Sequence, residues 1–205
     1  MRHRNLSDPT VNKKIKPTNT GHLKLLKDVD FNMSKMLAVY SGGGKMRNIM
    51  MLLELSGHGI PWLIGSIITI IITNNQLKEV YLNLLFALVL DLLMVATVKG
   101  VVRRPRPNYN QQDMLATVSL DLFSFPSGHA TRATMVALFL LHHLQLTMFY
   151  NFFLIIWALS VCISRILLGR HYVFDVLCGI IIGCIQCNLV EQFWISYEFI
   201  GYIYA

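Results

Sequence analysis

Five long apolar runs set the strongest limit on what this chain can fold into. They cover residues 59–74, 80–98, 133–149, 151–168 and 173–195. A helix of about 20 apolar residues crosses the ~30 Å hydrocarbon core of a bilayer, and it satisfies its own backbone hydrogen bonds there. With 54% hydrophobic and only 14% charged residues, the chain is too apolar for an ordinary soluble domain. We therefore predict an all-α, polytopic membrane bundle of about five transmembrane helices.

The first of these runs is too short to span a bilayer alone. At ~1.5 Å per residue, residues 59–74 reach only about 24 Å. We therefore expect this span to begin earlier, within residues 48–55, and to be broken near residues 57–61, where glycine and proline occur.

Positive charge is concentrated in the N-terminal part of the chain, where ten of the eighteen lysines and arginines lie within residues 1–58. We divide the chain into a basic tail, residues 1–45, and a membrane-embedded domain, residues 46–205. Residues 1–27 lack the apolar core of a cleavable signal peptide. They read either as a tail attracted to the membrane surface or as a solvated, disordered one. Residues 28–39 read as an interfacial amphipathic helix, with Asp28, Asp30 and Lys35 on its polar face, or as an ordinary surface helix.

Three short polar patches interrupt this apolar chain, each next to the end of a predicted span. The patches are Lys99 with Arg106-Pro107, then Pro126-Ser127-Gly128-His129, then Ser164-Arg165 with His171 and Asp175. If the basic tail is cytosolic, five alternating spans bring all three patches to the cytosolic side. Such groups are costly in or near hydrocarbon, so we expect them to form one functional site.

These residue types suit the binding of a phosphoryl group. A helix starting near Ser127 presents free backbone N–H groups and a positive dipole end to an anion, and Gly128 lets the backbone approach closely. Lys99, Arg106 and Arg165 add positive charge, and an arginine adds a forked donor. We therefore predict Lys99, Arg106, Ser127, Gly128 and Arg165 as phosphate-binding residues.

The two histidines and the aspartate suit nucleophilic and acid–base chemistry. His171 and Asp175 are four residues apart, so the carboxylate can hold one imidazole nitrogen protonated while the other attacks. His129 is then available as the general acid for the leaving oxygen. We predict His171, Asp175 and His129 as the catalytic residues.

These motifs resemble those of the type 2 phosphatidic acid phosphatase (PAP2) superfamily, lipid phosphate phosphatases that share a site with vanadium haloperoxidases. No defining motif position is substituted. The resemblance implies that His171 is a phosphohistidine nucleophile oriented by Asp175, that His129 donates the proton, and that the five other residues bind phosphate. It also implies a haloperoxidase-like helical core, a lipid phosphate substrate, and no metal, cofactor or nucleic acid.

A closer likeness covers roughly residues 52–190 and points to the superfamily members that act on polyisoprenoid diphosphates and monophosphates. It implies farnesyl, geranylgeranyl and presqualene diphosphates as substrates and a multi-pass location in the endoplasmic reticulum membrane and nuclear envelope. The alternatives are a phosphatidate or sphingosine-1-phosphate phosphatase, or a non-catalytic binding protein.

Several other polar residues are open to a structural interpretation. Asp91, in the middle of a span, is expected to be a buried, hydrogen-bonded structural group, and His58 is expected to lie in a turn. His142 and His143 are adjacent, so they point about 100° apart on a helix and are not expected to bind a metal together. The four cysteines are expected to be ordinary buried thiols.

Overall fold

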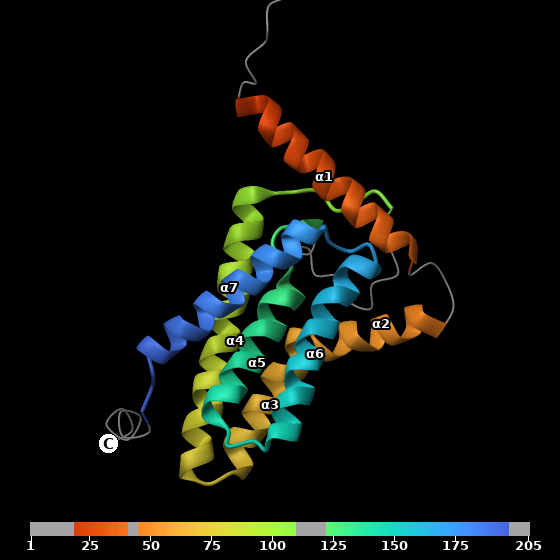
Figure 1. The fold of residues 1–205 in the computed structure, drawn as a ribbon. Coiled ribbons are helices and arrows are strands. Elements are labelled where there is room, and N and C mark those ends of the chain that lie inside the picture. Colours follow the sequence, from red (N-terminus) through yellow and green to blue (C-terminus); the bar gives the residue numbers. More distant parts are fainter. Residues whose placement is uncertain (1–18, 41–44, 110–121, 197–205) are drawn as a thin grey trace, which may run out of the picture.

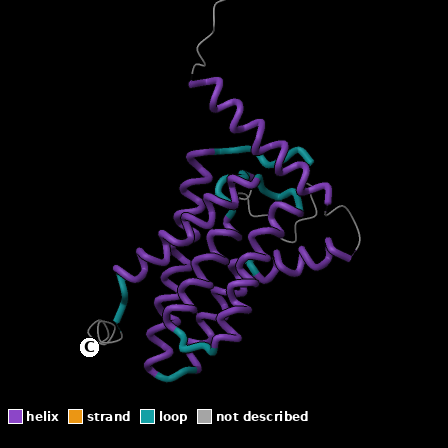
Figure 2. The backbone as a smooth tube through the Cα atoms, viewed as in Figure 1, coloured by secondary structure: helices purple, strands orange, loops and turns teal. Residues whose placement is uncertain are grey.

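A computed structural model describes residues 19–40, 45–109 and 122–196. The described chain is helical apart from loops and one isolated bridge between Pro105 and Phe123 (Figure 2). Its helices are α1 (Asn19–Tyr40), α2 (Lys45–Ser56), α3 (Gly59–Ile72), α4 (Asn75–Val102), α5 (Gly128–His143), α6 (Met148–Leu167) and α7 (Val173–Gln192). Residues 1–18 of the predicted basic tail and 110–121 of the loop before α5 lie outside this description. The predicted all-α membrane bundle is confirmed (Figure 1).

The predicted break in the first span is present. α2 and α3 together are apolar enough to form one span, but they are bent by 45°. The bend falls at Gly57 and His58, and the His58 Nδ1 atom accepts a hydrogen bond from the Ile60 N–H (3.3 Å) at the start of α3. Pro61 is tolerated in the first turn because N–H groups there have no partner within the helix.

By length and composition, three described helices could cross a membrane alone: α4, α6 and α7. The bent pair α2–α3 makes a fourth candidate. The remaining predicted span, residues 133–149, differs from the structure, because α5 begins at Gly128 and ends at His143. α5 lies at the centre of the bundle among α4, α6 and α7, so protein rather than lipid surrounds most of its length (Figure 1).

Its interior position explains why α5 begins in polar sequence. The Arg132 guanidinium forms an ion pair with Asp91 of α4 (2.7 Å), and the Thr131 hydroxyl donates to the same carboxylate (2.8 Å). All three side chains are buried. A buried charge is retained only when it is paired. The structural role predicted for Asp91 is therefore confirmed. Arg132 is a residue of α5 with its side chain buried in the bundle, where its Nη1 also donates to the Gly57 carbonyl (3.3 Å).

Close packing of α5 against α7 depends on two small residues. Gly179 and Gly183, one helical turn apart, allow the backbones to approach, as small residues do between membrane helices. A Cβ atom at Gly183 would lie 2.5 Å from the Thr131 carbonyl oxygen and 2.9 Å from Thr134 Cβ. Backbone atoms cannot move aside as a flexible side chain can, so the two helices would have to separate.

We therefore expect Gly183→Ala to lower the free energy of unfolding by about 1–3 kcal/mol, the usual cost of overpacking. Thermal unfolding of the detergent-purified protein measures this change. Gly65→Ala in α3 is the matched control, because a Cβ there meets nothing within 4 Å and alanine favours a helix. Equal melting temperatures for Gly183→Ala and Gly65→Ala would contradict the close packing.

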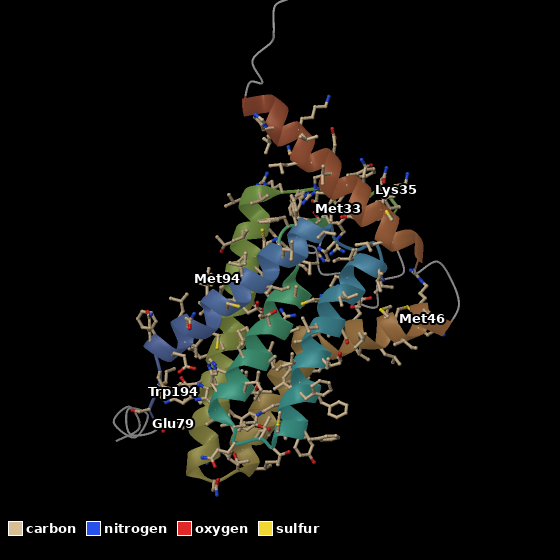
Figure 3. The ribbon with its side chains drawn as sticks, viewed as in Figure 1. Met33, Lys35, Met46, Glu79, Met94 and Trp194 are labelled. Carbon is tan, nitrogen blue, oxygen red and sulfur yellow. The ribbon has the colours of Figure 1, made fainter. Side chains whose placement is uncertain are left out.

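α1 lies across the end of the bundle where α4 ends and α7 begins (Figure 1). Asp30 departs from the predicted amphipathic pattern, whereas Asp28 and Lys35 are exposed as predicted. Asp30, assigned to the polar outer face, is 1% exposed, whereas Met36 and Leu37 are exposed. Met33 and Lys35 also lie on the outer side of α1 (Figure 3). Asp30 turns inward because Arg104 binds its carboxylate inside (2.7 Å).

Candidate active site

The predicted site residues meet at the end of the bundle beneath α1 (Figure 1). Lys99 lies in the last turn of α4, Ser127 caps α5, Arg165 lies in the last turn of α6, and Asp175 lies in the first turn of α7. The starts of α5 and α7 are joined by a backbone hydrogen bond, in which the Ser127 N–H donates to the Asp175 carbonyl (3.1 Å). Arg106 reaches the same region, where its guanidinium donates to the Arg170 carbonyl (3.4 Å).

Several buried donors in this region have no hydrogen-bond partner among the described residues. They are Nε and Nη1 of Arg165, the Ser127 hydroxyl, and Nε2 of His129. Unsatisfied buried polar groups are costly and rare in folded proteins, and their clustering marks a site built for a polar ligand. Together with the free N–H groups at the start of α5, they form an arrangement suited to an anion.

A tight turn after α6 delivers His171 to this cluster. Gly169 adopts a left-handed conformation (φ 68°), which glycine tolerates without strain. The N–H groups of Arg170 and His171 both donate to the Arg165 carbonyl (3.0 and 3.2 Å). The His171 side chain is therefore held next to the helix end that carries Arg165.

The tautomer of His171 follows from one hydrogen bond. Its Nδ1 atom lies 2.7 Å from the Ser124 carbonyl oxygen, which can only accept, so Nδ1 carries the proton. Nε2 of the neutral ring then keeps its lone pair. Burial lowers the pKa of His171 well below 6.5, and the positive charges of Arg106, Arg165 and Lys99 lower it further. The imidazole is thus neutral near pH 7, as a nucleophile must be.

This lowered pKa predicts how activity depends on acidity. Protonation of His171 removes the lone pair, so the acidic limb of the pH–rate profile should begin only where pH drops to the lowered pKa. We expect kcat/KM to hold its value down to about pH 6, below the ordinary histidine pKa of ~6.5. A pH–rate profile measures this, and an acidic midpoint at or above 6.5 would contradict it. Arg106→Gln removes a nearby cation and should move the midpoint to higher pH.

Asp175 is near His171, but it does not form the expected hydrogen bond. The closest approach, between His171 Nδ1 and Asp175 Oδ2, is 3.9 Å. The Asp175 carboxylate instead accepts from the Tyr172 N–H (3.0 Å) and pairs with Arg104 (2.7 Å). The Ser124 carbonyl is therefore the group that directly orients the ring. Asp175 supplies a negative charge one step further away.

Two charged residues at the site were not identified from the sequence. Glu54 of α2 is buried and binds both Arg165 (3.1 Å) and Arg170 (3.3 Å). It leaves Nε and Nη1 of Arg165 available to a ligand while holding Nη2. The available signal was a lone acid in the apolar sequence 49–55, which is a candidate functional residue by default. Arg170 adjoins His171, but nothing in the local pattern singles it out.

The remaining polar residues have defined places. The His58 ring lies 6.1 Å from the His129 ring, centre to centre, so this turn residue borders the site. Arg103 follows the last residue of α4 in a left-handed conformation, and its Nε donates to the Gly100 carbonyl (2.8 Å).

At the opposite end of the bundle, His142 and His143 both approach Glu191 (3.6 and 2.7 Å) despite being adjacent. Nearby, Trp194 donates to Glu79 (2.6 Å; Figure 3). The four cysteines are free thiols: Cys162 and Cys187 are buried as predicted, whereas Cys178 and Cys184 are only partly buried.

The fold defines a helical membrane protein that gathers basic side chains and two histidines at one end of its bundle. Sequence comparison then identifies the family. The model of the PAP2 superfamily matches residues 80–195. The chain belongs to that superfamily, and its match spans helices α4 to α7, which carry most of the predicted site.

Known proteins of this superfamily resemble the chain over different lengths. A probable lipid phosphate phosphatase beta of Arabidopsis thaliana is 37% identical over 143 residues, which cover 57% of this chain and 67% of the plant protein. Sphingosine-1-phosphate phosphatase 1 of Mus musculus is 33% identical over 49% of this chain, but the match covers only 26% of the mouse protein. The crystal structure of a transmembrane PAP2-type phosphatidylglycerolphosphate phosphatase from Bacillus subtilis superposes with a TM-score of 0.63, at 26% identity, over 86% of this chain and 87% of that one.

Proposed function

We propose that this protein is a membrane-embedded lipid phosphatase that works through a phosphohistidine intermediate at His171. The observation that carries the proposal is the Nε2 lone pair of His171, in the same cluster as donors of Arg165, Ser127 and His129 that have no partner in the described part of the chain. A nucleophile and an anion cradle in one buried cluster are the two parts that phosphoryl transfer requires.

The proposed reaction has two steps. In the first, His171 Nε2 attacks the terminal phosphorus, and the bond from that phosphorus to its leaving oxygen breaks. The leaving oxygen is the bridging oxygen of a diphosphate, which departs as the lipid monophosphate, or the alcohol oxygen of a monophosphate, and His129 gives it a proton. In the second, His129 takes a proton from water as the water oxygen attacks phosphorus, and the P–N bond breaks to release inorganic phosphate. Arg165, Arg106, Lys99 and the start of α5 stabilise the charge that develops on the phosphoryl oxygens.

The proposed substrates are polyisoprenoid diphosphates and monophosphates such as farnesyl, geranylgeranyl and presqualene diphosphate. The sequence likeness over residues 52–190 supports this choice. The named relatives support the wider class of lipid phosphates, including sphingosine-1-phosphate and phosphatidylglycerophosphate. Phosphate release by the purified protein from farnesyl diphosphate, phosphatidate and sphingosine-1-phosphate at equal mole fraction in micelles tests the proposal. A kcat/KM for farnesyl diphosphate below the other two would refute the isoprenoid assignment.

Chelation tests the proposed metal-independent chemistry, in which Lys99, Arg106 and Arg165 neutralise the phosphate without a metal ion. Activity on farnesyl diphosphate should be unchanged in EDTA, and vanadate should inhibit by occupying the site as a transition-state analogue. Activity that is lost in EDTA and restored by Mg²⁺ would show that the proposed chemistry is wrong.

We place the site on the cytosolic face of the endoplasmic reticulum membrane and nuclear envelope, on the side of the basic N-terminal region. The exposed Lys24, Lys27 and Lys35 of α1 lie at the same end as the site, which fits the tendency of lysine and arginine to stay cytosolic. Sealed, right-side-out microsomes should therefore hydrolyse a water-soluble diphosphate without detergent. Activity that appears only after the vesicles are opened would place the site in the lumen.

A further inference from the structure

α1 provides hydrogen-bond partners for the start of α7, although the two segments are far apart in the sequence. The Asp30 Oδ1 atom accepts from the Phe174 N–H (3.0 Å), and the Ser34 hydroxyl accepts from the Val173 N–H (2.9 Å). The first N–H groups of a helix have no partner within that helix, so such caps stabilise its first turn. That first turn of α7 contains Asp175 and follows directly after His171.

Arg104 joins Asp30 to Asp175. Its Nη2 lies 2.7 Å from Asp30 Oδ2, and its Nη1 lies 2.7 Å from Asp175 Oδ1. The guanidinium also covers the Tyr172 ring, 3.8 Å from its centre, an arrangement typical of cation–π contacts. Burial opposes the charge on Arg104, but Asp30 and Asp175 outweigh it and raise the pKa of the guanidinium. One arginine thus pairs with two buried carboxylates, one at each Nη atom.

The same arginine also supports the other group near His171. The Ser124 N–H donates to the Arg104 carbonyl (2.8 Å), while the Ser124 carbonyl accepts from the His171 ring (2.7 Å). A displacement of Arg104 would therefore reach His171 by two routes. One passes through the Asp175 carboxylate and the other through the Ser124 backbone.

We propose that Asp30 of α1 is a positioning residue of the active site, which acts through Arg104 to hold the Asp175 carboxylate and the Ser124 carbonyl in place beside the His171 ring. This role rests on the proposed function of His171. It makes a helix outside the matched superfamily region part of the catalytic unit, since that region begins at residue 80. Asp30 does not contact the phosphate-binding groups, so its loss should slow the chemical step and leave substrate binding intact.

Asp30→Asn tests this role with little change in size, because it removes the charge that pairs with Arg104. We expect kcat to fall by about 10- to 100-fold, the size of effect seen when a metal ligand loses the partner that orients it, while KM stays within about twofold of wild type. Asp28→Asn is the matched control, as Asp28 is exposed on the same helix. Asp30→Glu keeps the charge and should recover part of the lost kcat. Wild-type kcat in Asp30→Asn, or an equal loss in Asp28→Asn, would overturn the proposal.

A double-mutant cycle with Arg104→Gln separates positioning from general destabilisation. If Asp30 acts through Arg104, the double variant should be no slower than Arg104→Gln alone. If the two losses in kcat multiply, Asp30 acts by another route and the proposal fails. His171→Ala, measured in parallel, keeps the two claims distinct. Activity retained in His171→Ala refutes the proposed function, whereas an inactive His171→Ala beside a fully active Asp30→Asn refutes only the role of Asp30.

Discussion

Replacing His171 by alanine should abolish the covalent intermediate and lower kcat on the order of 10⁶-fold, comparable to loss of the nucleophile in a catalytic triad. Alanine has no nitrogen to attack phosphorus, and no second neutral imidazole is held at that position. Labelled substrate, quenched without acid because phosphohistidine is acid-labile, should mark the wild-type protein and leave His171→Ala unlabelled.

His142→Ala is the matched control for this experiment. His142 lies at the opposite end of the bundle and is more than half exposed, so its loss should leave labelling unchanged. Asp175→Asn should keep a nucleophile in place and label more slowly than wild type. Label that persists in His171→Ala would mean that another residue carries the phosphoryl group.

Replacing Arg165 by lysine should lower kcat by about 10²- to 10³-fold, the usual cost of losing one preorganised donor to a developing oxyanion. Arg165 binds Glu54 with one nitrogen, while its other two nitrogens have no hydrogen-bond partner among the described residues. A lysine ammonium is a single point charge, so it cannot satisfy Glu54 and the phosphate with the same planar fork. Steady-state kinetics on farnesyl diphosphate measures the effect.

Arg103→Lys provides the comparison, because Arg103 lies just after α4 and its exposed side chain donates to a backbone carbonyl. It should retain wild-type kcat. Near-wild-type turnover in Arg165→Lys would show that only the charge matters. Glu54→Gln should fall between the two variants, since it removes the carboxylate that orients Arg165 but leaves the guanidinium in place.

The membrane architecture was predictable because it depends on local properties of the chain. Apolar runs must be helical in lipid, and the short first run implied the break that the structure shows at Gly57 and His58. The grouping of the predicted site residues also followed, because alternating spans bring every second helix end to the same side. The limits of α5 were less predictable, since burial by other helices lets it include Thr131 and Arg132.

Hydrophobicity and the alternation of spans did not predict which side chains from distant segments contact one another. The four-residue spacing of His171 and Asp175 suggested a direct hydrogen bond, but that geometry requires both residues to lie in one helix. α7 begins at Val173, so His171 lies in the preceding turn and its ring bonds to Ser124 instead. Asp30 looked like part of a solvent-facing surface, because its partner Arg104 lies 74 residues away in sequence.

The helices, the membrane setting and the chemical types gathered at one end of the bundle could be inferred from the chain alone, because hydrophobicity and helix periodicity act over short distances. The pairing of each carboxylate with its cation became visible in the folded bundle. Glu54 with Arg165, Asp91 with Arg132, and Asp30 with Arg104 each join different helices or a helix and a loop. A buried charge is costly unless it is paired, and the partner available to it depends on the packing of the whole bundle.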